Sequence, residues 1–266
     1  MSEVKIAPIP DLGQRTDEIT IYAGPCSVES AEQFDEVAEC IADLGLTWIR
    51  GGAFKPRTNP HSFQGLGEEA LKIMKSAGDR YNLKTLTEVM DSAHCQLVAD
   101  YVDGLQVGAR NFQNFSLLKK IGEVTADTHQ MVLYKRGFAG TIAEWLAATD
   151  YITDHGNTNV VLCERGIRTF ETSMRNTLDL AGVVMLHKMT HLPVVVDPSH
   201  ACGHAWMVPE LAKAAVAAGA DGLMIEVHNN PAKAKCDGAQ SLTPDQFDAL
   251  MQFIGKEVEF FGKKMN

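Results

Sequence analysis

Eight short runs rich in β-branched and apolar residues recur along the chain of 266 residues, and stretches with helical patterning separate them. The runs cover residues 18–25, 48–54, 83–89, 104–109, 129–136, 159–164, 193–198 and 222–227. Most are apolar throughout, which is typical of parallel strands that are covered on both faces. Eight strands that alternate with helices predict an α/β fold, and in its simplest form a single (β/α)8 TIM barrel.

The expected helices carry start signals as well as periodicity. In 30–44, the capping residue Ser30 precedes an apolar stripe that includes Phe34 and Ile41. Thr243 followed by Pro244 marks the start of a final helix, because proline is favoured at the first helical position. The same patterning predicts helices over 92–99, 115–121, 141–153 and 207–218.

An open doubly wound sheet is the alternative architecture for such an alternation. Its nucleotide-binding members carry a glycine-rich loop after the first strand, whereas the turn at 23–29 reads Ala-Gly-Pro-Cys-Ser-Val-Glu. No linker rich in Gly, Ser or Pro divides the chain. We therefore expect one catalytic barrel over residues 18–266, preceded by a short N-terminal extension over residues 1–17.

Composition excludes several classes of function. The formal net charge of −10 argues against a broad nucleic-acid interface, which requires a basic face. No apolar run approaches the roughly 20 residues of a membrane span, and the N-terminus lacks a secretory signal. The six cysteines form no CxxC pair and are read as thiols in a reducing compartment. A cytoplasmic enzyme is the expectation.

Four side chains able to bind a metal lie at or just after the ends of the first run and the last two runs. In a closed barrel the last strand pairs with the first, so these side chains become neighbours. A thiolate, an imidazole and two carboxylates form a competent site for a divalent transition metal. The four residues are Cys26, His200, Glu226 and Asp237.

Alternatives remain at this site. A strand-end cysteine such as Cys26 is often a small buried apolar residue instead of a ligand. His204 and His228 lie close enough in sequence to compete with His200 for the ligand role.

Positive side chains gather after the runs that end near residues 54, 109, 136 and 164. Loops at the C-terminal ends of barrel strands share one mouth, where crowded positive charges cost energy unless an anion neutralises them. Arginine and lysine suit phosphate and carboxylate oxygens, so the pattern indicates a ligand with more than one anionic group. The cations are Arg50, Lys55, Arg57, Arg110, Lys135, Arg136 and Arg165.

Local ion pairs are the competing interpretation of these cations. Glu88, Asp91 and Glu164 lie near enough in sequence to pair with some of them. Arg136 and Arg168 are the members most expected to face solvent instead of a ligand.

Six segments together carry a family resemblance: Gly-Pro-Cys-Ser-Val-Glu-Ser at 24–30, Arg-Gly-Gly-Ala-Phe-Lys-Pro-Arg-Thr at 50–58, Ser-Phe-Gln-Gly-Leu-Gly at 62–67, Gly-Ala-Arg at 108–110, Asp-Pro-Ser-His at 197–200 and Ile-Glu-Val-His at 225–228. Their combination resembles the 3-deoxy-D-arabino-heptulosonate 7-phosphate (DAHP) synthases of the short type I beta branch, and the resemblance spans residues 18–260. It implies a metal-dependent, aldol-like condensation of phosphoenolpyruvate with erythrose 4-phosphate, which yields DAHP and phosphate as the first step of the shikimate pathway to aromatic amino acids.

The resemblance also implies roles for individual residues. Phosphoenolpyruvate would be bound by Arg50, Lys55, Arg110, Lys135 and Arg165, and the aldose phosphate by Arg57 and Thr58. The metal would be held by Cys26, His200, Glu226 and Asp237. Manganese is the expected ion, with iron, zinc and cobalt as alternatives.

Catalytic roles are expected for Lys55 and for the two metal ligands Cys26 and His200. Lys55 could transfer a proton, because neighbouring cations should lower its pKa. Glu88 would either position a water or pair with Arg110, and pairing is the preferred interpretation. Asp197 would orient His200.

Rival functions remain open. The related 3-deoxy-D-manno-octulosonate 8-phosphate synthases use arabinose 5-phosphate and carry Lys-Ala-Asn-Arg-Ser where this chain has Lys-Pro-Arg-Thr at 55–58, so this segment favours the four-carbon aldose. A catalytically idle barrel that binds a partner is a second rival. The resemblance further implies a homodimer or homotetramer without a regulatory domain, although a separate partner such as a chorismate mutase could regulate it.

Overall fold

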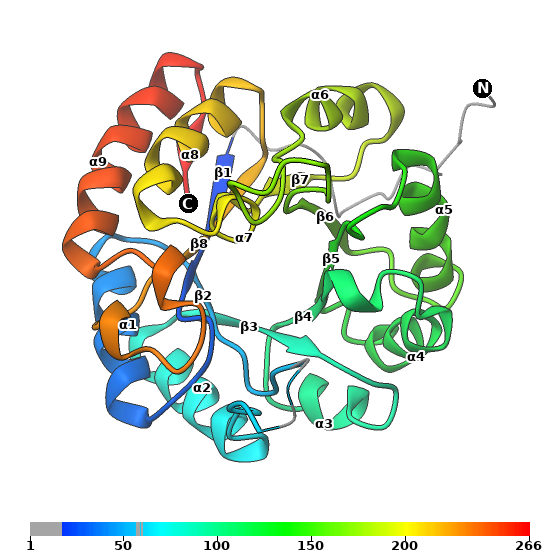
Figure 1. Ribbon diagram of the computed structural model, residues 1–266. Coiled ribbons are helices and arrows are strands. Elements are labelled where there is room, and N and C mark those ends of the chain that lie inside the picture. Colours follow the sequence, from blue (N-terminus) through cyan, green and yellow to red (C-terminus); the bar gives the residue numbers. More distant parts are fainter. Residues whose placement is uncertain (1–17, 57–58, 60) are drawn as a thin grey trace.

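Eight parallel strands close into a barrel in the computed structural model, which describes residues 18–56, 59 and 61–266 (Figure 1). Each strand pairs with its neighbour in sequence, and β8 pairs with β1 so that Glu226 lies opposite Gly24. The predicted (β/α)8 barrel is confirmed, because an open sheet would leave β1 and β8 apart. The strands are β1 (Glu18–Gly24), β2 (Trp48–Arg50), β3 (Lys84–Val89), β4 (Gly104–Val107), β5 (Met131–Lys135), β6 (Val160–Glu164), β7 (Val194–Val196) and β8 (Gly222–Glu226).

Helices surround the barrel on its outside (Figure 1). Ser30 caps α1 by accepting a hydrogen bond from the backbone N–H of Gln33, and Thr243 caps α9 within a capping box. These two starts agree with the sequence signals. The helices are α1 (Ala31–Asp43), α2 (Glu68–Tyr81), α3 (Cys95–Ala99), α4 (Phe115–Thr125), α5 (Ile142–Thr153), α6 (Leu180–Met189), α7 (Pro198–Cys202), α8 (Val208–Ala217) and α9 (Pro244–Phe260).

The structure differs from the expected elements in several places. The second run was expected to be extended over 48–54, but β2 ends at Arg50 and the chain then leaves the sheet through two glycines. Helices α2, α6 and α7 were not predicted, nor was the short strand β9 (Lys264–Met265), which pairs with the start of β1. The expected extension over residues 1–17 lies outside the described residues.

The core has two layers, as a barrel requires. The larger layer packs the outer faces of the strands against the helices. The smaller layer fills the barrel interior with side chains from six strands, and the Tyr22 hydroxyl there donates to the sulfur of Met131 at 3.3 Å. This interior layer comprises Tyr22, Leu86, Met131, Leu133, Val161, Cys163, Val195 and Met224, with Trp48 against it.

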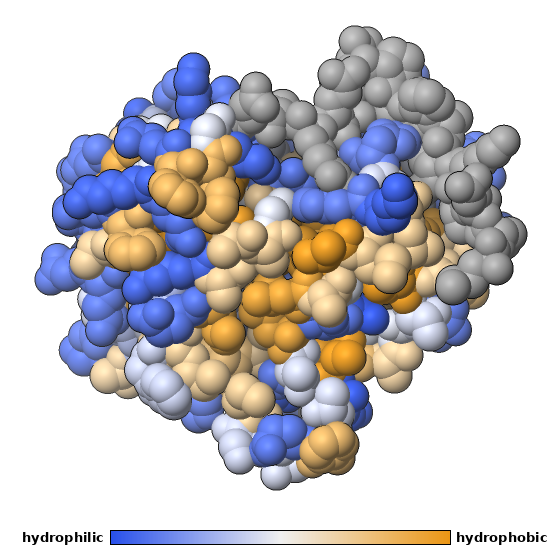
Figure 2. Space-filling model, turned by 90° about the horizontal axis from the view of Figure 1, so that it is seen from above, coloured by the Kyte–Doolittle hydropathy of each residue, from blue (hydrophilic) through white to orange (hydrophobic). Residues whose placement is uncertain are grey.

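Apolar residues gather in the middle of the face seen in Figure 2, and polar residues lie to either side of them. On α6, Val184 and Met185 are more than half exposed. Among the helices that the structure describes, none is long and apolar enough to cross a membrane.

Candidate active site and metal centre

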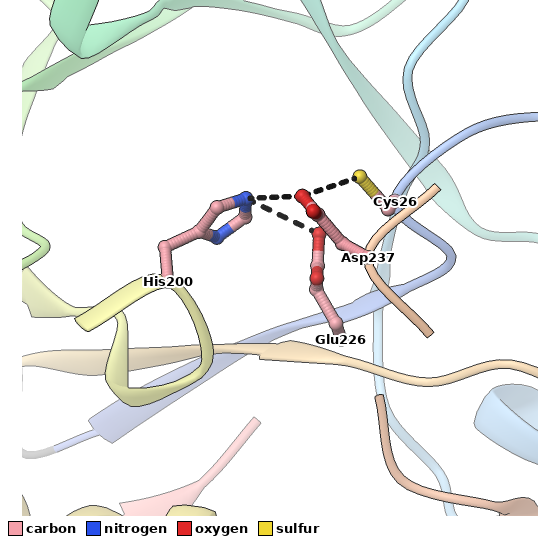
Figure 3. A group of neighbouring side chains, drawn as sticks. All are labelled: Cys26, His200, Glu226 and Asp237. Atoms are coloured by element: carbon pink, nitrogen blue, oxygen red, sulfur yellow. Dashed lines mark hydrogen bonds and ion pairs between the residues drawn. The ribbon is translucent and has the colours of Figure 1, made fainter. Parts of the chain in front are cut away.

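Four side chains point toward one another where the strands end: Cys26, His200, Glu226 and Asp237 (Figure 3). Their candidate ligand atoms all lie within 4.8 Å of one another. His200 Nε2 is 3.3 Å from Oε1 of Glu226 and 4.0 Å from Oδ2 of Asp237. The sulfur of Cys26 lies 3.2 Å from the same Asp237 oxygen. Thus the structure brings together the four residues that the sequence grouped.

Barrel closure and local backbone geometry place these side chains. Glu226 ends β8, and its register partner Gly24 lies two residues before Cys26. Position 24 requires glycine, because its φ is +146° and a Cβ would lie 2.0 Å from the carbonyl oxygen of Arg50. Asp237 adopts a left-handed conformation, with a φ of 51°, in the segment between β8 and α9. Aspartate tolerates this region better than most residues.

The two competing histidines do not join this group. His228 is buried, and its Nε2 lies 3.6 Å from Oε1 of Glu29 while Nδ1 accepts from the backbone N–H of Asn230. His204 lies outside the barrel mouth, where its Nε2 is 3.4 Å from the carbonyl oxygen of Ser173.

The donor set suits a divalent ion. Cysteine, histidine and carboxylate ligands bind such ions at about 2.0–2.3 Å, which leaves donor atoms roughly 3–4 Å apart around one ion. Burial lowers the pKa of His200 and keeps its imidazole neutral, as metal binding requires. Burial acts against ionisation of Asp237, but the positive charge of Arg175 holds the pKa of its carboxyl well below the ordinary range. These two groups are therefore in the protonation state of a ligand.

Cys26 is held differently. A hydrogen bond with Cys236, whose sulfur lies 3.1 Å away, and burial together raise the pKa of the Cys26 thiol. A bound cation must therefore displace the thiol proton, which makes metal binding dependent on pH.

Asp197 contacts His200 on the side of the imidazole opposite the proposed ligand atom Nε2. Its Oδ2 lies 2.7 Å from His200 Nδ1, and its Oδ1 accepts from the His200 backbone N–H at 3.0 Å. Lys135 donates to the same Oδ2 at 2.7 Å. The geometry agrees with the expected orienting role of Asp197.

A pocket adjoins the four-residue group, and His200 and Asp237 are among the residues that line it. Five of the predicted substrate-binding cations line it: Arg50, Lys55, Arg110, Lys135 and Arg165. The other two predicted phosphate-binding residues, Arg57 and Thr58, lie outside the described residues.

The buried cations of the pocket differ in how far the protein neutralises them. Arg50 donates to the carbonyl oxygen of Pro25 at 2.7 Å and to Oε1 of Glu226 at 3.2 Å. Arg165 is only 3% exposed, and its NH1 has no hydrogen-bond partner among the described residues. Burial lowers the pKa of Arg165, and its guanidinium stacks 4.8 Å from the ring centre of Phe138. An anion in the pocket would satisfy this group.

Lys55 corrects one expectation. Its Nζ donates to the carbonyl oxygen of Cys26 at 2.9 Å and approaches the Cys26 sulfur at 3.1 Å. Burial lowers the pKa of Lys55, but its interactions with the sulfurs of Cys26 and Cys236 outweigh burial and raise it above its ordinary value. The prediction that neighbouring cations lower this pKa is wrong, because it counted the cations and omitted the sulfurs.

Arg136 and Glu88 also depart from expectation, whereas Arg168 faces solvent as expected. Arg136 does not face solvent: it is buried, and its NH1 donates to Glu164 at 3.0 Å and to Asp179 at 2.7 Å. Arg168 is exposed, with its guanidinium 5.1 Å from the ring centre of Phe138. Among the described residues no ion pair joins Glu88 to Arg110, and Glu88 instead accepts from Gln106 at 3.4 Å.

Sequence reasoning missed three residues around the site. Arg175 lines the pocket, and its NH1 lies 3.4 Å from Oδ2 of Asp237. Cys236 lies beside Cys26, and Gln240 donates to Glu226 at 2.6 Å. Cys236 and Gln240 lie within three positions of Asp237 in the sequence, and this closeness to a proposed ligand could have identified them. Arg175 lies in the long segment between β6 and α6, far from any strand end.

Comparisons with known proteins agree with the resemblance seen in the sequence. The profile of the DAHP synthetase I family matches residues 12–260. A phospho-2-dehydro-3-deoxyheptonate aldolase from Thermotoga maritima is 48% identical over 247 residues, which cover 93% of this chain and 72% of that protein. A 2-dehydro-3-deoxyphosphooctonate aldolase from Nitrobacter hamburgensis is 32% identical over 275 residues, which cover 94% and 92% of the two chains.

Solved structures give the same result. The crystal structure of the Thermotoga maritima aldolase, also named DAHP synthase, superposes with a TM-score of 0.90 at 48% identity and covers 94% of this chain and 72% of that one. A truncated form of the 3-deoxy-D-arabino-heptulosonate 7-phosphate synthase from the same organism gives a TM-score of 0.86 at 44% identity, with 94% and 90% coverage.

Proposed function

Given that the chain is an enzyme of the DAHP synthetase I family, we propose that it condenses phosphoenolpyruvate with erythrose 4-phosphate and water to give DAHP and phosphate. This would be the first step of the shikimate pathway. The observation that carries the proposal is the position of Arg165, a buried cation whose NH1 lacks a partner among the described residues, in the same pocket as His200 and Asp237. Such a pocket offers an anionic substrate both charge and a neighbouring metal site.

The chemistry requires one new carbon–carbon bond and the loss of one phosphate. C3 of phosphoenolpyruvate attacks the aldehyde carbon, whose oxygen takes up a proton. Water adds at C2, and the resulting hemiketal phosphate expels phosphate and becomes the ketone. A divalent ion held by Cys26, His200, Glu226 and Asp237 would supply Lewis-acid polarisation of the aldehyde oxygen.

The protein's own side chains would bind and orient the reactants. Arg165 and Arg110 would hold the phosphate of phosphoenolpyruvate, since neither has an ion-pair partner among the described residues. Lys55 and Lys135 would contribute fixed positive charge near the carboxylate or phosphate. Because its pKa is raised, Lys55 would act mainly as a cation that stays protonated. Arg57 and Thr58 would bind the phosphate of the aldose, as the resemblance implies.

The rival substrate is arabinose 5-phosphate, because the chain is also similar to a 2-dehydro-3-deoxyphosphooctonate aldolase. Phosphate release should be measured with phosphoenolpyruvate and each aldose phosphate in turn, with and without a chelator. We expect phosphate release with erythrose 4-phosphate when Mn²⁺ is present, and no release with arabinose 5-phosphate or with a chelator. Faster release with arabinose 5-phosphate would favour the rival, and no release with either would favour an idle barrel.

The finer features of the assignment remain predictions. Manganese is the proposed native ion, and iron, zinc and cobalt are the alternatives that metal analysis of the purified protein distinguishes. A homodimer or homotetramer is the assembly that the family resemblance implies. Regulation by a separate partner such as a chorismate mutase and a cytoplasmic location also remain predictions.

A further inference from the structure

The two oxygens of Glu226 have separate partners. Oε1 faces the four-residue group, at 3.3 Å from His200 Nε2 and 3.2 Å from Arg50 NH1. Oε2 points away and accepts a hydrogen bond from Nε2 of Gln240 at 2.6 Å. Both side chains are buried, at 0% and 2% exposure, so water does not compete for this hydrogen bond. The carboxylate is therefore held with one oxygen toward the proposed metal.

Arg175 fixes the orientation of the Gln240 amide. Its NH1 donates to Oε1 of Gln240 at 2.8 Å. A guanidinium only donates hydrogen bonds and a carboxylate only accepts them, so the amide oxygen must face Arg175 and the amide nitrogen must face Glu226. The reverse orientation would lose both hydrogen bonds.

The same Arg175 nitrogen also approaches a second member of the group. It lies 3.4 Å from Oδ2 of Asp237, the oxygen that accepts from the Cys26 thiol. The backbone holds Arg175 in this position, because its N–H donates to the carbonyl oxygen of Cys202 at 3.1 Å. Arg175 and Gln240 thus connect the carboxylates of Glu226 and Asp237 through one hydrogen-bonded chain.

We infer that Gln240 is a positioning residue for the metal centre and that Arg175 acts with it. The pair orients Glu226 and Asp237 before an ion binds, so less ordering of the ligands remains for the ion to impose. Gln240 does not line the substrate pocket, and its effect reaches the reaction only through the ion. This inference rests on the proposed metal-dependent function.

Manganese binding to the metal-free, full-length chain tests the inference, with free Mn²⁺ followed by electron paramagnetic resonance. Gln240→Met keeps the length of the side chain and removes both hydrogen bonds. We expect it to weaken Mn²⁺ binding by about 10-fold or more. At saturating Mn²⁺, its KM for phosphoenolpyruvate should stay within about twofold of the wild-type value, because no substrate contact is lost.

Gln106 provides a matched control. It is also a buried glutamine whose Nε2 donates to a carboxylate, at 3.4 Å from Oε2 of Glu88, but Glu88 is not one of the four proposed ligands. Gln106→Met should leave the Mn²⁺ affinity within about twofold of wild type. Equal Mn²⁺ affinity of Gln240→Met and the wild type would overturn the positioning role and leave the proposed function intact. A wild-type chain that binds no Mn²⁺ would overturn both.

Arg175→Met keeps the inference testable if Gln240→Met does not fold, since the Arg175 side chain is 34% exposed. It should also weaken Mn²⁺ binding, and unchanged affinity would count against the chain of hydrogen bonds. Where both variants fold, their double variant should lose less affinity than the sum of the two single losses, because both changes break the same network. Fully additive losses would contradict joint action.

Discussion

Lys135 and Asp197 form a buried ion pair at the mouth of the barrel, with Nζ and Oδ2 2.7 Å apart. The side chains are 4% and 0% exposed, and the same carboxylate oxygen lies 2.7 Å from Nδ1 of His200. One carboxylate thus neutralises the lysine that ends β5 and orients the histidine in α7. Because neither charged group is solvated by water, each relies on the opposite charge of the other for its electrostatic stabilisation.

Replacing Asp197 by Asn should destabilise the fold strongly. The change leaves the ammonium of Lys135 buried without its counter-charge, and breaking such a pair costs about 3–5 kcal/mol in the free energy of unfolding. The double variant Asp197→Asn, Lys135→Met should recover much of this loss, because it removes both charges. Urea unfolding of the wild type, Asp197→Asn, Lys135→Met and the double variant measures the coupling energy of the pair. If the losses of the two single variants add up to that of the double variant, the pair does not act as a unit.

The stability that Asp197 provides should disappear in acid. Burial raises its pKa, but the contacts with His200, hydrogen bonds included, and the positive charge of Lys135 outweigh burial and hold the pKa well below the ordinary range. The unfolded carboxyl titrates near about 3.9, so the stabilisation is complete above that pH and is lost as the pH falls toward the lowered pKa of the folded state. The difference in unfolding free energy between wild type and Asp197→Asn should therefore be constant from about pH 7 to 5 and shrink below about pH 4. A difference that grows on acidification would contradict the assigned direction.

Two buried arginines should respond oppositely to replacement by methionine. Arg165 has an NH1 without a partner among the described residues, so Arg165→Met should leave stability unchanged or raise it by about 1–3 kcal/mol. It should also raise the KM for phosphoenolpyruvate by about 10-fold or more, because a buried charge-assisted contact to the substrate is lost.

Arg136 is the matched control, since its NH1 pairs with both Glu164 and Asp179. Arg136→Met leaves the buried carboxylate of Glu164 without its positively charged partner and should lower the unfolding free energy by about 3–5 kcal/mol. Urea unfolding and phosphate-release kinetics on both variants measure the contrast. If Arg165→Met were the more destabilised of the two, Arg165 would be a structural residue and not a substrate-binding one.

Barrel closure was predictable from the sequence because eight strands alternate with helices and the turn after the first strand lacks the glycine-rich loop of an open nucleotide-binding sheet. Eight strands with helices between them leave the first and last strands to pair, and this pairing brings Cys26 near Glu226 across almost the whole chain. The grouping of His200 and Asp237 with them followed from their place after strand ends. Side chains at strand ends are placed by the sheet, whose geometry is regular.

Side chains on long loops could not be placed in the same way. Arg175 reaches the site from the segment between β6 and α6, where no periodic signal fixes its direction. Arg136 was misjudged because one of its acids, Asp179, lies 43 residues away and enters through the same segment. The raised pKa of Lys55 depends on the distance of its Nζ from the Cys26 sulfur, which no pattern of residue types contains.

Removing the metal, or the sulfur that would bind it, should abolish turnover without unfolding the barrel. Cys26→Ala deletes one of four donor atoms that lie within 4.8 Å of one another, so Mn²⁺ affinity and phosphate release should both fall below about a hundredth of the wild-type values. The metal-free variant should keep the far-UV circular dichroism of the metal-free wild type, because the backbone around residue 26 is held by the pairing of β1 with β8. Cys40→Ala, on the outer helix α1, should change neither Mn²⁺ affinity nor turnover.

Chelation of the wild type should reproduce the loss of phosphate release, and added Mn²⁺ should reverse it. Full phosphate release from a chain shown by elemental analysis to hold no metal would end the Lewis-acid assignment, whatever the geometry of the four donors.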